Sequence, residues 1–326
     1  MTLISVIIPV RKINSYIIKK IIPALDNQTY KNFELIIVCQ SAGKTKFPNF
    51  VKVIKTKINN PAKMRDIGAS KAKGSFLAFI DDDVYPHKNW LKNSLHYFKN
   101  KKIAGVCGPG VTPPQNNILQ KVSGWVWSSW LGAGGAGTYR CLPCKKRYVD
   151  DYPTFNLIIR KKDFDKIGGF NTHFWPGEDT KLCHDLVYKL KKKIIYDPKI
   201  LVYHHRRPIF IPHLRQISRY GLHRGYFAKT LPKTSLRIGY FIPSMFAVFF
   251  LLIPLAYYFS NNKLILFFYV YILVFYFILI LLNSFYVFLK QGSLLLSLLL
   301  IPAVFCTHLT YGIFFIAGLL TPKLCR

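Results

Sequence analysis

The first half of the chain alternates between continuous apolar runs and segments whose apolar residues recur at helical spacing. Residues 3–10, LISVIIPV, predict a strand buried on both faces, as in a parallel sheet. Apolar residues from Ile17 to Leu25 then recur at helical spacing, and turn residues lead into a second apolar run at 33–38. This order predicts a strand–helix–strand unit at the start of the chain.

The same alternation continues to about residue 106. Further strands are predicted at 51–55, 75–80 and 103–106. A helix is predicted to begin at Pro61, because proline is favoured in a first helical turn. Three consecutive aspartates, residues 81–83, follow the strand at 75–80 directly. Ligands of open α/β sheets bind beyond the carboxyl ends of the strands, so we expect these acids at the ligand-binding edge. Adjacent carboxylates repel one another, and a divalent metal is the simplest compensating charge.

The segment 112–147 is expected to be irregular. It contains three of the five tryptophans and a cluster of glycines. Two interpretations stay open: a mobile lid or acceptor groove with aromatic walls, and an amphipathic surface segment whose tryptophans lie against lipid. Strand character resumes at 152–161, and a helix is expected after Gly177.

The last third of the chain is nearly free of charge. Stretches of 25, 26 and 32 residues without Lys, Arg, Asp or Glu lie between Arg237, Lys263, Lys290 and Lys323. Each is longer than the roughly 20 residues that cross a hydrocarbon core, so three transmembrane helices are predicted, rather than a soluble bundle whose helices would need polar faces. Basic residues at 224–237 favour a cytosolic N-terminal part, which would leave the tail after three spans outside.

The net charge of the chain indicates which kinds of molecule it can bind. The chain has 46 Lys and Arg against 14 Asp and Glu, a net charge of +32, and every acid lies at or before Asp197. Such a balance suits anionic lipid and phosphate-bearing substrates, or nucleic acid; the predicted spans favour the former, and no nucleic acid is expected. The chain has neither G-x-G-x-x-G nor a P-loop, so hydride transfer and P-loop phosphoryl transfer lose support. The seven cysteines are expected to be free thiols, and the pair Cys141 and Cys144 lacks nearby metal ligands.

Several motifs together resemble one family. SVIIPV, NQTYKNFELIIV, FIDDDV, IGGFN followed by GEDTKL, and QISRY occur in the order seen in family 2 of the glycosyltransferases, over roughly residues 3–225. The resemblance implies an inverting enzyme with an α/β fold: a GT-A (Rossmann-like, mostly parallel sheet) catalytic domain followed by an all-α transmembrane region. We therefore expect a cytosolic GT-A domain at 1–225, a basic interfacial linker at 226–238 and about three transmembrane helices at 239–322.

The resemblance also implies a metal site and a general base. Asp81 and Asp83 would bind Mg²⁺ or Mn²⁺ through the diphosphate of a nucleotide sugar, with Asp82 toward the ribose. In the pair Glu178 and Asp179, the aspartate would be the general base. The alternatives are an acidic turn at the end of a strand for the first group and acids at a helix start for the second.

Donor-binding residues follow from the same resemblance. Gln216, Arg219 and Tyr220 form Q-x-x-R-Y, a variant of the Q-x-x-R-W element of processive members, and would contact the diphosphate and wall the acceptor site. Tyrosine in place of tryptophan puts a processive polymerase in doubt. The alternative is a basic amphipathic helix on the membrane surface.

A few further positions are assigned to the donor or metal site by the same resemblance, and one position departs from the family's pattern. Pro9, Arg11 and Arg65 are assigned to the donor site. His205, next to His204, would complete the metal shell or be structural. Cys39 and Gln40 stand where relatives carry an acid that reads the base, so the base stays open.

Two functions are carried forward. The first is a membrane-bound inverting glycosyltransferase, an integral membrane protein with its catalytic domain in the cytosol, which transfers a sugar from a nucleotide-sugar donor to a lipid-linked or membrane-proximal glycan acceptor. One-sugar transfer fits better than chain extrusion, because three spans offer few helices for a channel. The alternative is a non-catalytic membrane scaffold that binds anionic lipid or nucleic acid through its basic face.

Overall fold

The computed structural model describes residues 2–43, 45–253, 257–258 and 263–324. Packing divides the chain into two compact units. The first comprises Met1–Pro113 and Leu142–His205, and the second Pro114–Cys141 and Arg206–Arg326. Residues 114–141 and 206–225, which were expected in the catalytic domain, therefore pack with the C-terminal helices.

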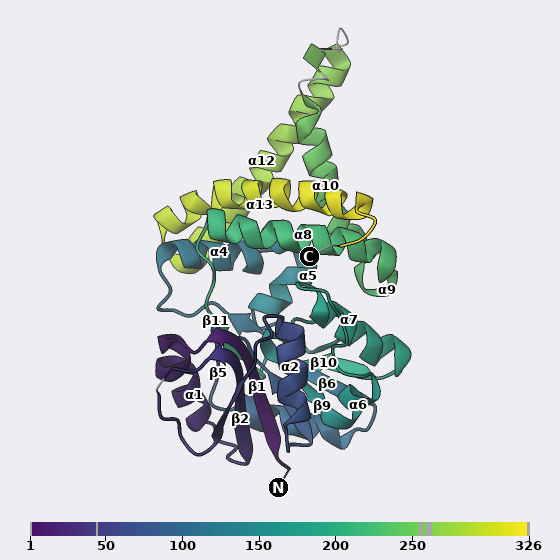
Figure 1. Ribbon diagram of the computed structural model, residues 1–326. Helices are drawn as coiled ribbons and strands as arrows, with labels where there is room; N and C mark the ends of the chain where they lie inside the picture. The colour runs from purple at the N-terminus through teal and green to yellow at the C-terminus, as the bar shows by residue number, and fades with distance from the viewer. Residues whose placement is uncertain (1, 44, 254–256, 259–262, 325–326) are drawn as a thin grey trace. The chain divides into compact units, whose positions relative to one another are not determined.

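The first unit is built around an eight-stranded sheet, whose strands β1 and β2 are seen in Figure 1. The strand order is β3-β2-β1-β4-β9-β6-β10-β8. The strands are β1 (Ile4–Lys12), β2 (Phe33–Ser41), β3 (Val51–Lys55), β4 (Phe76–Phe79), β6 (Ile103–Cys107), β8 (Arg147–Val149), β9 (Leu157–Arg160) and β10 (Lys193–Tyr196). Strands β1 to β4 pair in parallel, as do β6 and β10, whereas β8 and β9 run antiparallel to their neighbours. The expected mostly parallel α/β fold is confirmed.

The strands predicted from continuous apolar runs are present because those runs are buried. All residues of β1 from Ile4 to Val10 are buried, and only its last two residues are exposed. The helices of this unit are α1 (Ile22–Asp26), α2 (Pro61–Ser70), α3 (Trp90–Leu95), α6 (Lys161–Lys166) and α7 (Glu178–His184), with short π or 3₁₀ turns η1 (Ile17–Ile21), η2 (His96–Lys99), η3 (Thr154–Asn156) and η4 (Asp185–Lys189). Helix α2 begins at Pro61 as predicted, and the Asn60 side chain accepts a hydrogen bond from the backbone N–H of Lys63.

A second, three-stranded sheet has the order β5-β11-β7. Its strands are β5 (Val84–Pro86), β7 (Gly110–Val111) and β11 (Val202–His204). Strand β5 starts directly after the three aspartates, and its pairing with β11 sets His204 opposite Val84. This pairing brings the two histidines of the sequence motif beside the acidic turn.

The second unit consists of helices. They are α4 (Ile118–Ser128), α5 (Trp130–Cys141), α8 (Ile211–Thr230), α9 (Pro232–Ser235), α10 (Ile238–Leu251), α12 (Lys263–Gln291) and α13 (Leu294–Leu320). The expectation that 112–147 is irregular is wrong, because α4 and α5 occupy most of it. Asn117 starts α4 with a capping box shared with Gln120, and α5 absorbs the glycine cluster with a kink at Gly134.

Among the described residues of this unit, two helices are long and apolar enough to cross a membrane. They are the segments Leu266–Gln291 of α12 and Leu294–Leu320 of α13. The span predicted between Arg237 and Lys263 begins in α10, a shorter apolar helix of 14 residues, and its end lies partly outside the described residues.

Candidate active site

The three aspartates lie in a short turn between two strands at the carboxyl edge of the main sheet. The N–H of Ile80 still donates to the carbonyl of Ile7 in β1 (3.3 Å), and the N–H of Val84 donates back to the Asp81 carbonyl (3.2 Å) as β5 begins. The Asp81 and Asp83 side chains are 33% and 43% exposed, so both can be reached by a ligand. Burial, together with the neighbouring charges of Asp83 and Asp81, raises the pKa of Asp82 to about 7.

Arg65 connects this turn to the second acidic motif. Its side chain is buried on α2, and its two terminal nitrogens contact Oδ1 of Asp81 (2.6 Å) and Oε1 of Glu178 (2.9 Å). A planar guanidinium suits such a bridge because it presents donors in a fixed fork. The structure therefore brings Asp81 and Glu178 together, although 97 residues separate them in the sequence.

The neighbouring Asp66 ties the same helix to the glycine pair. Its Oδ1 accepts a hydrogen bond from the N–H of Phe170 (2.9 Å), and the Phe170 ring lies 5.7 Å from the Arg65 guanidinium. At Gly169, φ is +73° and a Cβ would lie 2.5 Å from Asp66 Oδ1, so glycine is required there. The I-G-G-F-N motif thus has a structural cause: it lets the backbone approach α2.

The Glu178 and Asp179 pair opens helix α7. Gly177 precedes it in a left-handed conformation (φ 109°), and no side-chain cap is present at that position. Glu178 is buried against Arg65, whereas Asp179 is half-buried and its Oδ1 accepts a hydrogen bond from the N–H of Thr180 (2.8 Å). The two acids of the motif therefore lie in different surroundings.

The histidines meet Asp83 in different ways. Nε2 of His204 lies 3.4 Å from Oδ1 of Asp83, while His205 donates its backbone N–H to the Asp83 carbonyl (3.0 Å). The ring of His205 packs edge-on against Tyr16, with centroids 4.7 Å apart, and burial lowers its pKa. His204, rather than the expected His205, thus presents its ring to the carboxylate.

Tyr16 is a neighbour of these groups that the sequence did not indicate. Its hydroxyl is buried and has no hydrogen-bond partner among the residues that the structure describes. Burial, followed by the charges of Tyr85 and Asp83, raises its pKa. A tyrosine at the start of a helix carries no local signal of this placement.

The acidic turn offers two side-chain carboxylates, those of Asp81 and Asp83, to the expected metal ion. Within the described part of the chain, no group of three or more His, Cys, Asp or Glu side chains is arranged to hold a metal ion, so Asp81, Asp83 and His205 do not form such a group. Mg²⁺ commonly takes only one or two protein carboxylates and completes its shell with water and substrate phosphates. Two partly exposed carboxylates on one turn fit that kind of site.

The other predicted donor residues lie in two places. Pro9 is buried in β1 opposite Val38, and Arg11 is exposed at the end of that strand. Gln216, Arg219 and Tyr220 lie on α8 in the second unit. There the Gln216 amide donates to the Tyr220 hydroxyl (3.0 Å), and Arg219 is exposed. Their role at the donor remains a prediction.

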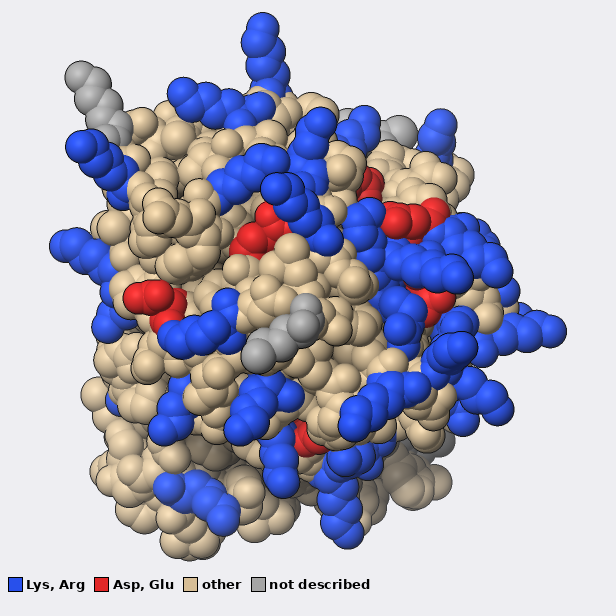
Figure 2. Space-filling model, turned by 90° about the horizontal axis from the view of Figure 1, so that it is seen from below, with Lys and Arg blue, Asp and Glu red and all other residues tan. Residues whose placement is uncertain are grey.

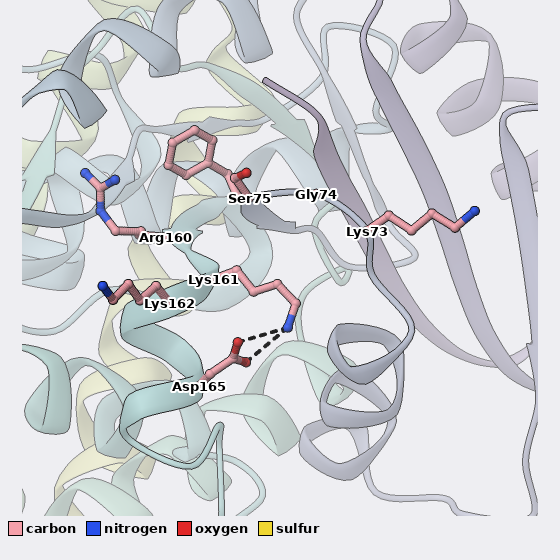
Figure 3. Close-up of a pocket in the computed structure, with 8 residues that line it drawn as sticks. Lys73, Gly74, Ser75, Arg160, Lys161, Lys162 and Asp165 are labelled. Carbon is pink, nitrogen blue, oxygen red and sulfur yellow. Dashed lines mark hydrogen bonds and ion pairs between the residues drawn. The ribbon is translucent and has the colours of Figure 1, made fainter. Parts of the chain in front are cut away.

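A pocket of about 500 Å³ lies away from the acids, at the amino end of β4 (Figure 3). Its lining residues are Lys73, Gly74, Ser75, Phe76, Arg160, Lys161, Lys162 and Asp165. Lys161 and Asp165 form an ion pair across it (3.0 Å). Figure 2, seen from below, shows many more Lys and Arg than Asp and Glu side chains on that face. The pocket contains none of the motif residues of the acidic turn, so it is not the candidate active site.

The sheet order and the acidic turn at its carboxyl edge define a class of fold, the GT-A-like α/β fold. The structure of mannosyltransferase PcManGT from Pyrobaculum calidifontis in complex with GDP-Man and Mn²⁺ shares the fold, with a TM-score of 0.55 and 16% identity, over 98% of this chain and 88% of that one. The family model for glycosyl transferase family 2 matches residues 5–168, half of the chain. The chain belongs to glycosyl transferase family 2.

Two similar proteins align with different fractions of this chain. A pre-mycofactocin glycosyltransferase of Mycobacterium tuberculosis is 29% identical over 148 residues, which are 45% of this chain and 30% of that protein. The dolichyl N-acetyl-alpha-D-glucosaminyl phosphate 3-beta-D-2,3-diacetamido-2,3-dideoxy-beta-D-glucuronosyltransferase of Methanococcus voltae is 24% identical over 262 residues, 74% of this chain and 76% of that protein. The chain thus spans less than a third of the first relative and most of the second.

Proposed function

We propose that this chain is a glycosyltransferase: a membrane-bound, inverting, metal-dependent enzyme that transfers a sugar from a nucleotide-sugar donor to a lipid-linked or membrane-proximal glycan acceptor. One observation carries the proposal: the buried Arg65 bridges Asp81 in the donor motif and Glu178 in the base motif. The name of the Methanococcus voltae relative, a dolichyl-phosphate-linked sugar transferase, supports a lipid-linked acceptor.

Asp179 is the proposed general base. It is half-buried at the start of α7, next to the anchored Glu178. In an inverting displacement, the acceptor hydroxyl oxygen forms a bond to the anomeric carbon from the face opposite the leaving group. The bond from that carbon to the diphosphate oxygen breaks, its electron pair leaves with the nucleoside diphosphate, and the hydroxyl proton passes to the Asp179 carboxylate. Glu178 is assigned to positioning, since Arg65 already engages its carboxylate.

Asp81 and Asp83 are the residues proposed to hold Mg²⁺ or Mn²⁺. A bound ion would neutralise charge that develops on the departing diphosphate. The guanidinium of Arg65 donates to the Asp81 carboxylate and so orients it, and the His204 ring on β11 lies next to the Asp83 carboxylate. Asp82 is assigned to the ribose. Pro9, Arg11, Gln216, Arg219 and Tyr220 are proposed to complete the donor and acceptor sites.

A matched pair of variants tests this assignment. Asp179→Asn removes the base and keeps the shape, so we expect transfer to fall by about 10²–10⁴-fold with an unchanged unfolding midpoint. Glu178→Gln breaks the buried ion pair with Arg65, so we expect a lower unfolding midpoint. The measurement is transfer from a panel of nucleotide sugars to membrane lipid extract with Mn²⁺, using detergent-solubilised protein, beside thermal unfolding.

The outcomes separate the competing functions. Full transfer by Asp179→Asn contradicts the proposed base. A wild-type protein that turns over no donor in the panel, yet binds anionic vesicles, would favour the non-catalytic scaffold.

A further inference from the structure

Helix α13 is apolar and long enough to cross a bilayer, yet its partner in the fold is a charged helix. Four close approaches join α8 and α13 in the same order along both helices. At the two ends, the His213 ring is hydrogen-bonded to the Thr307 hydroxyl (3.0 Å), and Lys229 donates to the Thr321 carbonyl (2.7 Å). Between them, a Cβ added at Gly221 would lie 2.8 Å from the Tyr311 carbonyl oxygen, and a Cβ added at Gly225 would lie 2.0 Å from the Phe315 carbonyl oxygen. The helices are therefore parallel and stay together over 16 residues of α8 and 14 of α13, on the order of 20 Å.

This packing fixes the two helices to one tilt. Glycine lets their backbones touch, because Gly225 lies against the Phe315 carbonyl and Gly318 lies against the Leu222 carbonyl, where a Cβ would come within 2.0 Å of oxygen at each. Figure 1 shows α8 and α13 side by side, and α10 and α12 running away from them. Whatever angle α13 makes with a membrane, α8 makes nearly the same angle.

Helix α8 is unsuited to hydrocarbon. It carries Arg215, Arg219 and Arg224, and the first two are exposed. The sequence of the second unit contains no Asp or Glu, so the unit offers these cations no carboxylate. Arginine is among the costliest residues to place at the centre of a bilayer. A crossing by α13 would carry α8 with it.

The other half of α13 is held by a second amphipathic helix. Val122 and Val126 of α4 pack in one apolar cluster with Leu296, Leu300 and Val304 of α13. Helix α4 also carries Lys121. The Ser123 hydroxyl of α4 bonds the same His213 that bonds α13, at 2.8 Å. Helices that carry basic residues therefore accompany α13 along most of its length.

The outward side of α13 is nevertheless apolar. Leu294, Leu298, Ile313 and Leu320 are 63%, 54%, 39% and 77% exposed. An apolar stripe beside exposed arginines is the pattern of helices that lie in the interface of a bilayer with anionic lipid, with the stripe toward the acyl chains and the cations toward the head groups.

We propose that α13 lies in the plane of the membrane interface together with α8 and α4, and that only α12 and the apolar sequence beginning in α10 cross the bilayer. This rests on the membrane anchoring in the proposed function, and it changes the topology expected from hydropathy. Two crossings, unlike three, return the chain after Leu320 to the side of the first unit.

Protease protection of an epitope tag tests the topology on the full chain. One form carries the tag after Arg326; the matched control carries it before Lys263, a position that both topologies place on the far side. In inverted vesicles we expect protease to remove the C-terminal tag and to spare the control tag, with the reverse in right-side-out vesicles. A C-terminal tag removed only in right-side-out vesicles would overturn the proposal and leave the membrane enzyme intact. A chain released from membranes by alkaline carbonate would instead overturn the anchoring itself.

Discussion

At the scale of single residues, Arg65 is the side chain on which the site depends most. Replacing it with methionine keeps the volume and removes the cation, which leaves the carboxylates of Asp81 and Glu178 without their shared partner. Breaking a buried pair in this way costs about 3–5 kcal/mol, so we expect a clearly lower unfolding midpoint and a loss of transfer. Lys63→Met, on an exposed position of the same helix, is the matched control. Equal midpoints for the two variants would contradict the bridging role.

Sequence reasoning assigned Arg65 to the base or phosphate of the donor because only its neighbours along the chain were visible. Its contact to Glu178 spans 113 residues, and nothing local announces it. The acidic turn at 81–83 was predictable because its signal is local: a buried strand that ends in acids. His204 lies between these two cases. The pair of histidines was found in the sequence, but which of the two rings faces Asp83 depends on the register in which β5 and β11 pair.

His213 gives the second unit a dependence on pH. Its ring is buried between the hydroxyls of Ser123 and Thr307, beside the Trp127 ring, and burial followed by the charge of Arg206 lowers its pKa to about 4. The unfolded chain, with a pKa near 6.5, therefore binds the proton more readily between about pH 6.5 and 4. The contribution of neutral His213 to the free energy of unfolding should be fully present above about pH 6.5. It should fall by roughly 3 kcal/mol as the pH drops from there to about 4.

The measurement is the thermal unfolding midpoint in detergent as a function of pH. His213→Gln keeps a neutral hydrogen-bonding side chain, so its midpoint should change less between pH 6.5 and 4 than that of the wild type. Parallel curves for the two proteins would show that His213 is not the group responsible.

At the scale of elements, burial decided most of what the sequence revealed. Strands β1, β2, β4 and β6 are mostly buried apolar runs and were predicted; β3, VKVIK, was also predicted, although its residues are half-buried or exposed. Helices α4 and α5 were not, because the prolines, glycines and tryptophans of 112–147 resemble a loop until α13 is present to bury Val122 and Val126. The short strands β5, β7 and β11 form only by pairing with one another, β11 lying between the other two.

The contact of α8 with α13 is the element-level feature most open to test. A methyl group at Gly225 would meet the Phe315 carbonyl at 2.0 Å, so Gly225→Ala should separate the helices and cost about 1–3 kcal/mol. Gly239→Ala is the matched control, since a Cβ there has no neighbour within 4 Å in the described structure. Alanine favours a helix by about 0.5–1 kcal/mol, so the control should unfold at the same or a higher temperature. An unchanged midpoint for Gly225→Ala would contradict the close backbone packing.

At the scale of the whole molecule, sequence and structure agree on the fold class and differ on how the chain is divided. Composition showed that all acids lie in the first two thirds, and that part does contain the α/β unit. Hydropathy is evaluated on each apolar stretch alone. The prediction of α13 as a span therefore took no account of the charged helix α8 that packs along it. The expected boundary at residue 225 likewise followed the chain, whereas 114–141 and 206–225 follow the packing.

This division predicts how truncated chains behave. A chain that ends at residue 225 keeps α4 and loses α13, so Val122 and Val126 would be exposed to water and the protein should aggregate. A chain that ends at residue 205, with 114–141 replaced by a Gly/Ser linker of equal length, contains only the first unit and should remain in the supernatant and unfold cooperatively. Sedimentation after high-speed centrifugation, with thermal unfolding of the soluble fraction, measures both. Equal solubility of the two chains would mean that α4 and α5 do not depend on α13, because the second chain lacks the apolar surface that the first one exposes.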